Sequence, residues 1–269
     1  MFFLITFLKV NSWQALVAFG AAFVAGAINS VAGGGTLLTF PTLIWLGLPS
    51  INANATSTVA IWPGTIGTIW GYRTELRTSS SRMLALVFPS VVGGILGALL
   101  LNHTPPAVFD ALVPFLILFA TLLFMIQEPI QRRLKISNSE SHKSTRWLIG
   151  AMSFQLFVAL YGGYFGAGIG ILMLAALSVL GLTDIHQMNG LKALLGASIN
   201  GVAALYFIWA GMVYWPEFVV MVIGAIIGGY GGALIARRIG GAAVRRIVII
   251  VGLSMAVSMF IKFFRAFAR

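Results

Sequence analysis

Long apolar segments alternate with short polar ones along the whole chain. Hydrophobic residues make up 59% of the 269 positions, and charged residues make up only 9%. No charged residue occurs between Lys9 and Arg73, or between Arg146 and Asp184. One membrane-spanning helix needs about 20 apolar residues, so each of these uncharged stretches is long enough for more than one crossing. The pattern predicts an all-α polytopic membrane protein.

Glycine, proline and charged residues divide the apolar sequence into ten predicted helical segments. These segments are 13–31, 34–48, 54–72, 83–101, 107–127, 147–165, 168–182, 189–210, 216–236 and 244–264. The hydrophilic stretch 128–146 separates five segments from the other five. We therefore expect a first transmembrane repeat over 1–127, a cytoplasmic linker over 128–146, and a second transmembrane repeat over 147–269.

The two halves are similar to each other in sequence. The run Val91–Leu100 matches Ile226–Ile235 at an offset of 135 positions, and Gly34 matches Gly168 at an offset of 134. Such a match indicates an internal duplication. Five crossings is an odd number, so the second copy must enter the membrane from the opposite side. The sequence thus predicts two inverted five-segment repeats.

The basic residues predict the orientation of the chain in the membrane. In the predicted topology, twelve lie in cytoplasmic loops and four on the other side. The twelve are Arg73, Arg77, Arg82, Arg132, Arg133, Lys135, Lys143, Arg146, Arg237, Arg238, Arg245 and Arg246, and the four are Lys9, Lys262, Arg265 and Arg269. This positive-inside bias places both termini outside, with residues 1–10 belonging to the mature chain. The net charge of +11 then reflects topology and contact with the anionic lipid bilayer, and no nucleic-acid partner is expected.

Two of the predicted segments, 34–48 and 168–182, are too short to cross a membrane. Fifteen helical residues span about 22 Å, whereas the hydrocarbon core is about 30 Å thick. We therefore expect glycine-broken, short or re-entrant helices. A helix that begins inside the membrane directs unpaired N–H groups and its positive dipole end at the break, which suits an anion. The alternative is that the glycines only permit tight helix packing. The candidate ligands at the breaks are Gly33, Gly34, Gly35, Gly166, Gly168 and Gly170.

Polar clusters follow both short segments at equivalent places. Asn54, Thr56 and Ser57 follow the first, and Asn189 follows the second. Hydroxyl and amide groups at a helix start are able to bind an oxyanion. Equally, Asn54 is suited to be a plain N-cap, and the Ser and Thr hydroxyls to bond their own backbone.

Lys192 is the one cation that lies well within an apolar segment. A lysine inside the bilayer costs about 2.5 to 3.5 kcal/mol, so it calls for a partner such as a bound anion. The alternative is that its side chain reaches back to the cytoplasmic surface. Asn200 lies eight residues further on nearly the same helix face, and Asn29 lies just before the first break. Both are candidates for the site, and both are equally suited to hydrogen bonds between helices.

Few signals point to catalysis or to a metal. The chain has no cysteine, which excludes thiolate sites, and its three histidines are scattered. We therefore expect no enzyme activity, no catalytic residues, no metal and no cofactor. The motifs Gly93-x-x-x-Gly97 and Gly228-x-x-x-Gly232 are typical of helix packing. A homodimer is compatible with such faces, although nothing in the sequence requires one.

Taken in order, these motifs resemble one transporter family over almost the whole chain. The motifs are Gly26–Pro41 (GAINSVAGGGTLLTFP), Ala53–Thr58 (ANATST), Gly163–Gly170 (GYFGAGIG), Leu191–Leu195 (LKALL) with Asn200, and Trp215-Pro216. They are similar to the TauE/SafE sulfite exporter-like permeases, also called the toluene sulfonate uptake permease family. In the second half, Gly-Ala-Gly-Ile-Gly replaces a longer glycine run, and Gly190-Leu191 replaces the usual Thr-Ser.

The resemblance implies a multi-pass permease of the bacterial inner membrane that moves small anions, chiefly sulfite and organosulfonates, by a secondary mechanism. Together with the inverted halves, it leads us to expect alternating access around an anion held between the half-helices. Two alternatives stay open. An anion channel of the same fold predicts ohmic flux without trans-stimulation. A non-transporting membrane protein predicts no flux and no effect of Lys192→Gln.

Overall fold

The computed structural model describes residues 11–31, 34–134, 145–179, 182, 184–239 and 241–267, and every regular element in these ranges is an α-helix. The helices are α2 (Ser12–Val31), α3 (Thr36–Trp45), α4 (Ser50–Gly71), α5 (Arg73–Arg77), α6 (Ser81–Leu84), α7 (Val87–His103), α8 (Pro106–Leu134), α9 (Thr145–Tyr164), α10 (Ile169–Val179), α11 (Ile185–Trp209), α12 (Trp215–Ile239) and α13 (Gly241–Phe267). Each of the ten predicted segments overlaps a helix, and α5 and α6 are additional short turns. The prediction of an all-helical protein is confirmed.

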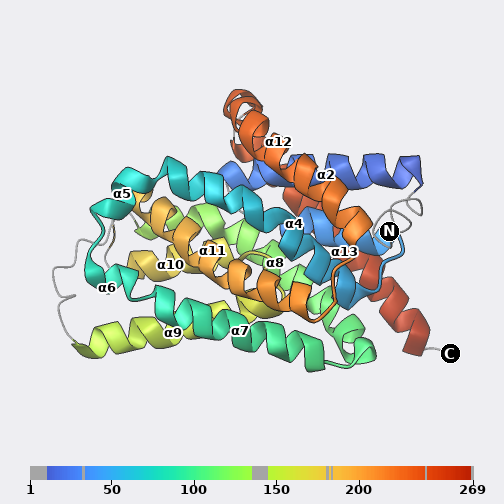
Figure 1. The fold of residues 1–269 in the computed structure, drawn as a ribbon, viewed down its shortest axis with the longest axis horizontal. Helices are drawn as coiled ribbons and strands as arrows, with labels where there is room; N and C mark the ends of the chain where they lie inside the picture. Colours follow the sequence, from blue (N-terminus) through green and yellow to red (C-terminus); the bar gives the residue numbers. More distant parts are fainter. Residues whose placement is uncertain are drawn as a thin grey trace.

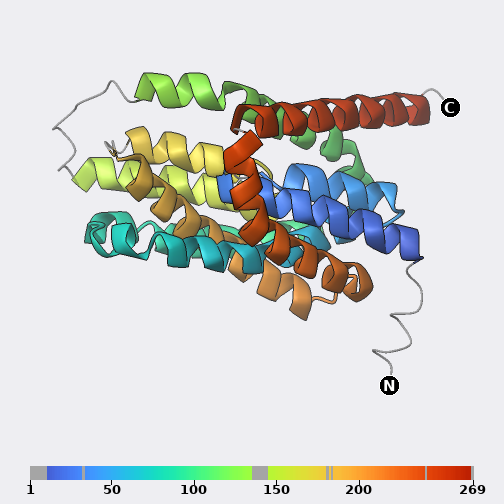
Figure 2. The same cartoon turned by 90° about the horizontal axis from the view of Figure 1, so that it is seen from above.

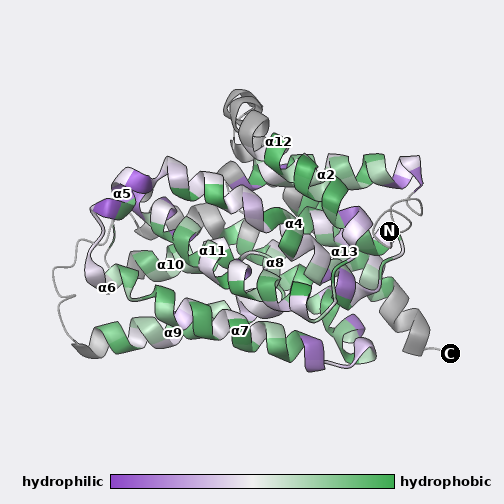
Figure 3. Ribbon diagram, viewed as in Figure 1, coloured by the Kyte–Doolittle hydropathy of each residue, from purple (hydrophilic) through white to green (hydrophobic). Residues whose placement is uncertain are grey.

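The helices form an elongated bundle with polar ends and apolar sides. Figure 1 shows α5 and α6 at one end, and the start of α2 and the end of α13 at the other. The same separation is seen from above in Figure 2. Hydrophilic residues gather near the two ends, and hydrophobic residues cover the sides (Figure 3). Leu16, Phe88 and Phe157 are each at least 70% exposed on those sides. Extensive apolar exposure along the sides of a bundle is typical of a membrane protein.

Three helical stretches in the described part of the chain are long and apolar enough to cross a membrane by themselves. They are Ser12–Asn29, Pro106–Leu123 and His186–Trp209. Shorter apolar stretches occur in α3, α7, α9, α12 and α13. Helix α4 is long, but it carries Asn, Thr and Ser side chains that lie buried against neighbouring helices, and these lower its hydropathy. A hydropathy criterion alone therefore misses helices, such as α4, that lie between the polar ends of the bundle.

The two short helices begin and end in the same way. Gly34 and Gly168 both have positive φ values, 97° and 80°, and their carbonyls accept the N–H groups of Leu37 and Ile171, both at 3.0 Å. At the other end, Leu48 N–H bonds Leu43 O and Leu182 N–H bonds Leu177 O, both at 3.1 Å. This six-residue closure is the Schellman type, and in α3 it follows Gly47 at φ 97°. Helices α3 and α10 have 10 and 11 residues, so they are even shorter than expected.

Two helices begin earlier than the sequence predicted. Helix α4 begins at Ser50 after Pro49, and α11 begins at Ile185 after Asp184, whose carboxylate accepts His186 N–H at 2.9 Å. Asn54 and Asn189 therefore lie in the second turns of their helices. The interpretation of Asn54 as an N-cap is wrong, because α4 already starts at Ser50 and Pro49 occupies the N-cap position.

Close helix packing is concentrated along two glycine-lined contacts. Helix α7 packs along α9, where a Cβ atom at Gly93 would lie 2.7 Å from the Leu156 carbonyl oxygen. Helix α12 packs along α2, where a Cβ atom at Gly228 would lie 1.9 Å from the Phe23 carbonyl oxygen. Each contact joins a helix of one half to a helix of the other. These small-residue faces are thus used for packing within the chain. They therefore no longer support the suggestion of a homodimer.

We expect Gly93→Ala to lower the free energy of unfolding by about 1 to 3 kcal/mol, because the new methyl group overpacks the α7–α9 contact. Gly20→Ala in α2 is the matched control, since no atom lies within 4 Å of the position a Cβ would take. Thermal denaturation of the two purified variants in the same detergent measures the difference. Equal melting temperatures for both variants would contradict this account of the α7–α9 contact.

Candidate functional site

The first glycine break is held together by a polar side chain. Asn29, on the last turns of α2, accepts the Gly35 N–H through Oδ1 at 2.7 Å. A Cβ atom at Gly35 would lie 2.6 Å from the Ala25 carbonyl oxygen, so only glycine fits between α2 and the start of α3. The structure therefore assigns Asn29 a capping contact at the N-terminus of α3. Gly33 lies outside the described residues.

Ser57 reaches the first break through Thr39. The Thr39 hydroxyl lies 2.6 Å from the Ser57 hydroxyl and 3.2 Å from the Gly35 carbonyl oxygen. Both side chains are fully buried. The pair fixes the side of α4 against the first turn of α3, just beyond the break.

The second break brings together three of the predicted residues. Gly166 and Gly168 both have positive φ values, and a Cβ atom at Gly166 would lie 3.8 Å from Asn200 Oδ1. The Tyr161 hydroxyl donates to the Ala167 carbonyl oxygen at 2.7 Å, in the loop between α9 and α10. Asn200 is thus placed beside the backbone of the second break.

Lys192 lies against the first turn of α10. Its ammonium donates to Asn189 Oδ1 at 3.0 Å, and a Cβ atom at Gly170 would touch the Lys192 Cδ atom at 3.4 Å. Among the described residues, no carboxylate pairs with this ammonium. Gly170, Asn189 and Lys192 therefore form one cluster, in which a lysine stem packs on glycine and its charge is met by a neutral amide.

Asn54 connects the first half to the second break. Its Nδ2 donates to the Tyr164 carbonyl oxygen at 2.9 Å, at the C-terminus of α9. Two residues after Tyr164 the chain reaches Gly166. Asn54 is 1% exposed, and its Oδ1 has no hydrogen-bond partner among the described residues. A buried polar atom without a partner is unusual in a protein.

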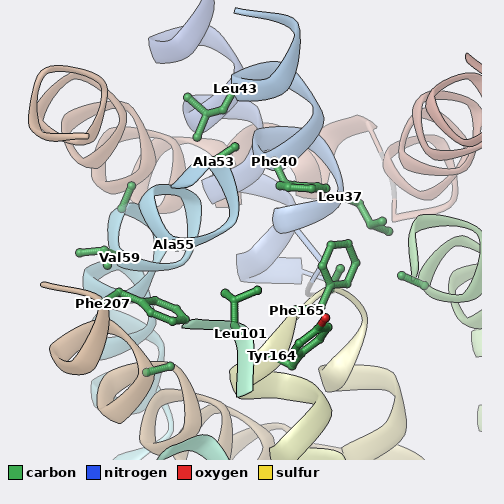
Figure 4. Close-up of a cluster of buried hydrophobic side chains, with 14 of the residues drawn as sticks. Leu37, Phe40, Leu43, Ala53, Ala55, Val59, Leu101, Tyr164, Phe165 and Phe207 are labelled. Carbon is green, nitrogen blue, oxygen red and sulfur yellow. The ribbon is translucent and has the colours of Figure 1, made fainter. Parts of the chain in front are cut away.

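Aromatic side chains bring the two breaks close together. Phe40 of α3 packs edge-on against Phe165, which directly precedes Gly166, with 5.2 Å between ring centroids. Phe109 of α8 contacts Phe40 at 6.5 Å and Tyr164 at 5.7 Å. Figure 4 shows Phe40, Leu37, Phe165 and Tyr164 in this shared core. The starts of the two short helices are therefore joined by one apolar cluster.

Thr56 is the predicted residue that lies away from both breaks. Its hydroxyl accepts the Tyr214 N–H at 3.0 Å, next to the first residue of α12, and its side chain is fully buried. The neighbouring Asn52 donates to the Met212 carbonyl oxygen at 2.9 Å. This end of α4 thus holds the turn between α11 and α12.

Three residues near the breaks were not predicted from the sequence. They are Thr39, Tyr161 and Trp62, whose indole N–H donates to the Ala197 carbonyl oxygen at 3.0 Å where α4 meets α11. Thr39 lies four residues after Gly35, on the same helix face, which is a spacing that the sequence does reveal. The donors at the breaks are amides, hydroxyls and one ammonium. No group of three His, Cys, Asp or Glu able to hold a metal occurs in the described part of the chain.

Comparison with known proteins gives consistent results. The family model described as "Sulfite exporter TauE/SafE" matches residues 18–259. A "Probable membrane transporter protein" of Haemophilus influenzae is 26% identical over 90% of this chain and 93% of its own length. The "Probable membrane transporter protein YfcA" of Escherichia coli K12 is 29% identical over 90% of this chain and 88% of its own length. No solved structure matches significantly.

We expect Asn29→Ala to lower the free energy of unfolding by about 1 kcal/mol, because the buried Gly35 N–H loses its acceptor. Asn102→Ala is the control, since Asn102 is an exposed residue whose hydrogen bond lies far from the breaks along the chain. Chemical denaturation of both variants measures the loss. If Asn29→Ala were no less stable than Asn102→Ala, the capping contact would not stabilise the break.

Proposed function

Because the chain belongs to the sulfite exporter TauE/SafE family of membrane transporters, we propose that it is a secondary transporter of a small anion, namely sulfite or an organosulfonate. The substrate would be held at the two glycine breaks, by the N-termini of α3 and α10 together with Lys192, Asn200 and Asn189. The family supplies the class of activity, and the chemistry of the breaks supplies the sign of the substrate's charge.

The observation that carries this proposal is the position of Lys192. The lysine lies seven residues after the start of α11, beside the N-terminus of α10, and no described carboxylate pairs with it. A cation inside the membrane that contacts only a neutral amide is not neutralised, so its charge is able to attract an anionic ligand. The positive dipole end of α10 adds to the same field, which favours an anion. Sulfite and sulfonate groups are compact anions with several acceptor oxygens, which suit such donors.

We further propose that the two halves are inverted repeats. Matching backbone bonds at both breaks support this, and so does the reciprocal helix pairing. The first of the five segments of each half packs along the fourth segment of the other half, as α2 with α12 and α9 with α7. In both pairs the glycine contacts advance in the same direction along the two helices, so paired helices run parallel. Parallel pairing between the halves at these positions supports an inverted second half.

Alternating access follows from this arrangement. The α2–α12 and α7–α9 contacts are tight and glycine-lined, so each pair is expected to move as a unit. Between them, α4 meets α11 at the Trp62 indole, which lies against Gly201 and bonds Ala197. Rocking about this crossing would expose the breaks to one side of the membrane and then to the other.

We expect Lys192→Gln to abolish stabilisation by the substrate anion while leaving the fold intact, because glutamine has similar length but no charge. The measurement is a thermal-shift screen of purified protein with sulfite, sulfate, thiosulfate, sulfoacetate, taurine and acetate. A ligand at a hundredfold excess over its Kd stabilises the folded state by about 2.7 kcal/mol. Flux of the stabilising anion into proteoliposomes should be lost in parallel.

Lys262→Gln is the matched control, because it removes the same charge from α13. It should keep both the thermal shift and the flux. Trans-stimulation of the flux separates a carrier from a channel. If no anion stabilised the wild type, or if Lys192→Gln retained the full shift, the anion site proposed here would be wrong.

We place the protein in the bacterial inner membrane with both termini outside. The native chain has no cysteine, so single-cysteine variants report topology without background. We expect Ser80→Cys, between α5 and α6, to react with a membrane-impermeant maleimide only after cells are permeabilised. His103→Cys, at the end of α7, should react in intact cells. Both residues are exposed, so burial does not explain a difference. The reverse labelling pattern would overturn this orientation.

A further inference from the structure

The buried carboxamide of Asn54 has a fixed orientation. The Tyr164 carbonyl oxygen 2.9 Å away is only an acceptor, so the NH₂ group of Asn54 must face it. Oδ1 therefore points away from Tyr164. It is buried, and no described residue donates a hydrogen bond to it. An acceptor in this position is incomplete unless a donor or a cation occupies the space before it.

The surroundings of this oxygen favour positive charge. The amide of Asn54 contacts the C-terminus of α9, where the helix dipole is negative. Thr58, one turn further along α4 on the same face, is buried and carries a hydroxyl group. This end of α9 therefore presents neutral oxygen ligands. Broken helices in transporters place coordinating ions at such C-terminal ends.

The other half of the protein has a cation at the corresponding place. Helices α4 and α11 start 135 positions apart, at Ser50 and Ile185, and Asn54 and Asn189 are separated by the same 135 positions. The Oδ1 of Asn189 accepts a hydrogen bond from the Lys192 ammonium at 3.0 Å. When the repeat offsets of 135 and 134 are subtracted from 192, Lys192 corresponds to positions 57 and 58 in the first half.

Neither of those positions supplies a charge. They are Ser57, whose hydroxyl is taken by Thr39, and Thr58. The first half thus keeps the asparagine oxygen without the ammonium that its counterpart holds.

We propose that Asn54 Oδ1 and the Thr58 hydroxyl, beside the end of α9, bind a monovalent cation of the sodium class. The cation takes the electrostatic place that the Lys192 ammonium holds in the second half. A divalent ion is disfavoured, because no carboxylate belongs to the ligand set. The site does not depend on which anion is carried, although the comparison of the halves rests on the repeat relationship proposed above. Bound beside the second break, the cation would couple its gradient to movement of the anion.

The test measures cation-dependent stability without any substrate. The melting temperature of the purified protein is followed as sodium chloride replaces N-methyl-D-glucamine chloride, with chloride constant, and again with potassium and lithium. We expect a saturable rise of about 3 to 6 °C at tenfold excess over the Kd. Asn54→Leu should abolish the rise, and Thr58→Val should raise the half-saturating concentration several-fold. Asn102→Leu, at an exposed position in the last turn of α7, should behave as wild type.

Each alternative outcome is distinct. If sodium, potassium, lithium and N-methyl-D-glucamine gave the same melting temperature in the wild type, the oxygen would be filled by water and the cation site would be refuted. An undiminished sodium effect in both Asn54→Leu and Thr58→Val would also refute it. If Asn54→Leu did not fold, Thr58→Val alone would decide. Failure here leaves anion stabilisation and its dependence on Lys192 unaffected, so the two proposals are separable.

Discussion

The structure depends on one constraint, which is that backbone groups freed at a glycine break must find partners within the protein. Lipid offers no hydrogen bonds, so each unpaired amide or carbonyl inside a membrane protein is costly. Asn29 therefore supplies an acceptor to the Gly35 N–H, and the Tyr161 hydroxyl supplies a donor to the Ala167 carbonyl. Both side chains come from the helix that precedes the break. At each break, the freed backbone group is thus hydrogen-bonded by a side chain from one or two turns earlier in the sequence.

This constraint also explains why the rest of the core gathers where it does. The breaks need cover on all sides, and the aromatic contacts of Phe40, Phe165 and Phe109 provide it. The polar side chains that reach inward, Asn54 and Ser57, come from α4, and Lys192 comes from α11. Because α4 and α11 are also joined at Trp62, the two helices form a common support for both breaks. A local property of glycine therefore influences the position of the central helices α4 and α11.

Much of this arrangement could be predicted from the sequence, because it depends on local signals. Uncharged runs reveal the helices, and the glycines before two short segments reveal the breaks. The contact between Asn189 and Lys192 follows from helical spacing. Partnerships across the chain could not be predicted. Nothing near Asn54 in sequence indicates Tyr164, and nothing near Thr56 indicates Tyr214, because both contacts depend on how distant helices pack. The starts of α4 and α11 were missed because buried asparagine in a membrane helix resembles a polar loop until its partners are known.

The reciprocal pairing of α2 with α12 also has a consequence for biogenesis. The glycine-lined face of α2 meets a helix that begins 184 residues after α2 ends. At a synthesis rate of about 5 to 20 residues per second, that partner emerges from the ribosome roughly 10 to 40 s later. During this interval α2 is already made but its close-packing surface is uncovered. The chain must therefore be inserted in a provisional arrangement, and the final bundle closes only when translation is nearly complete.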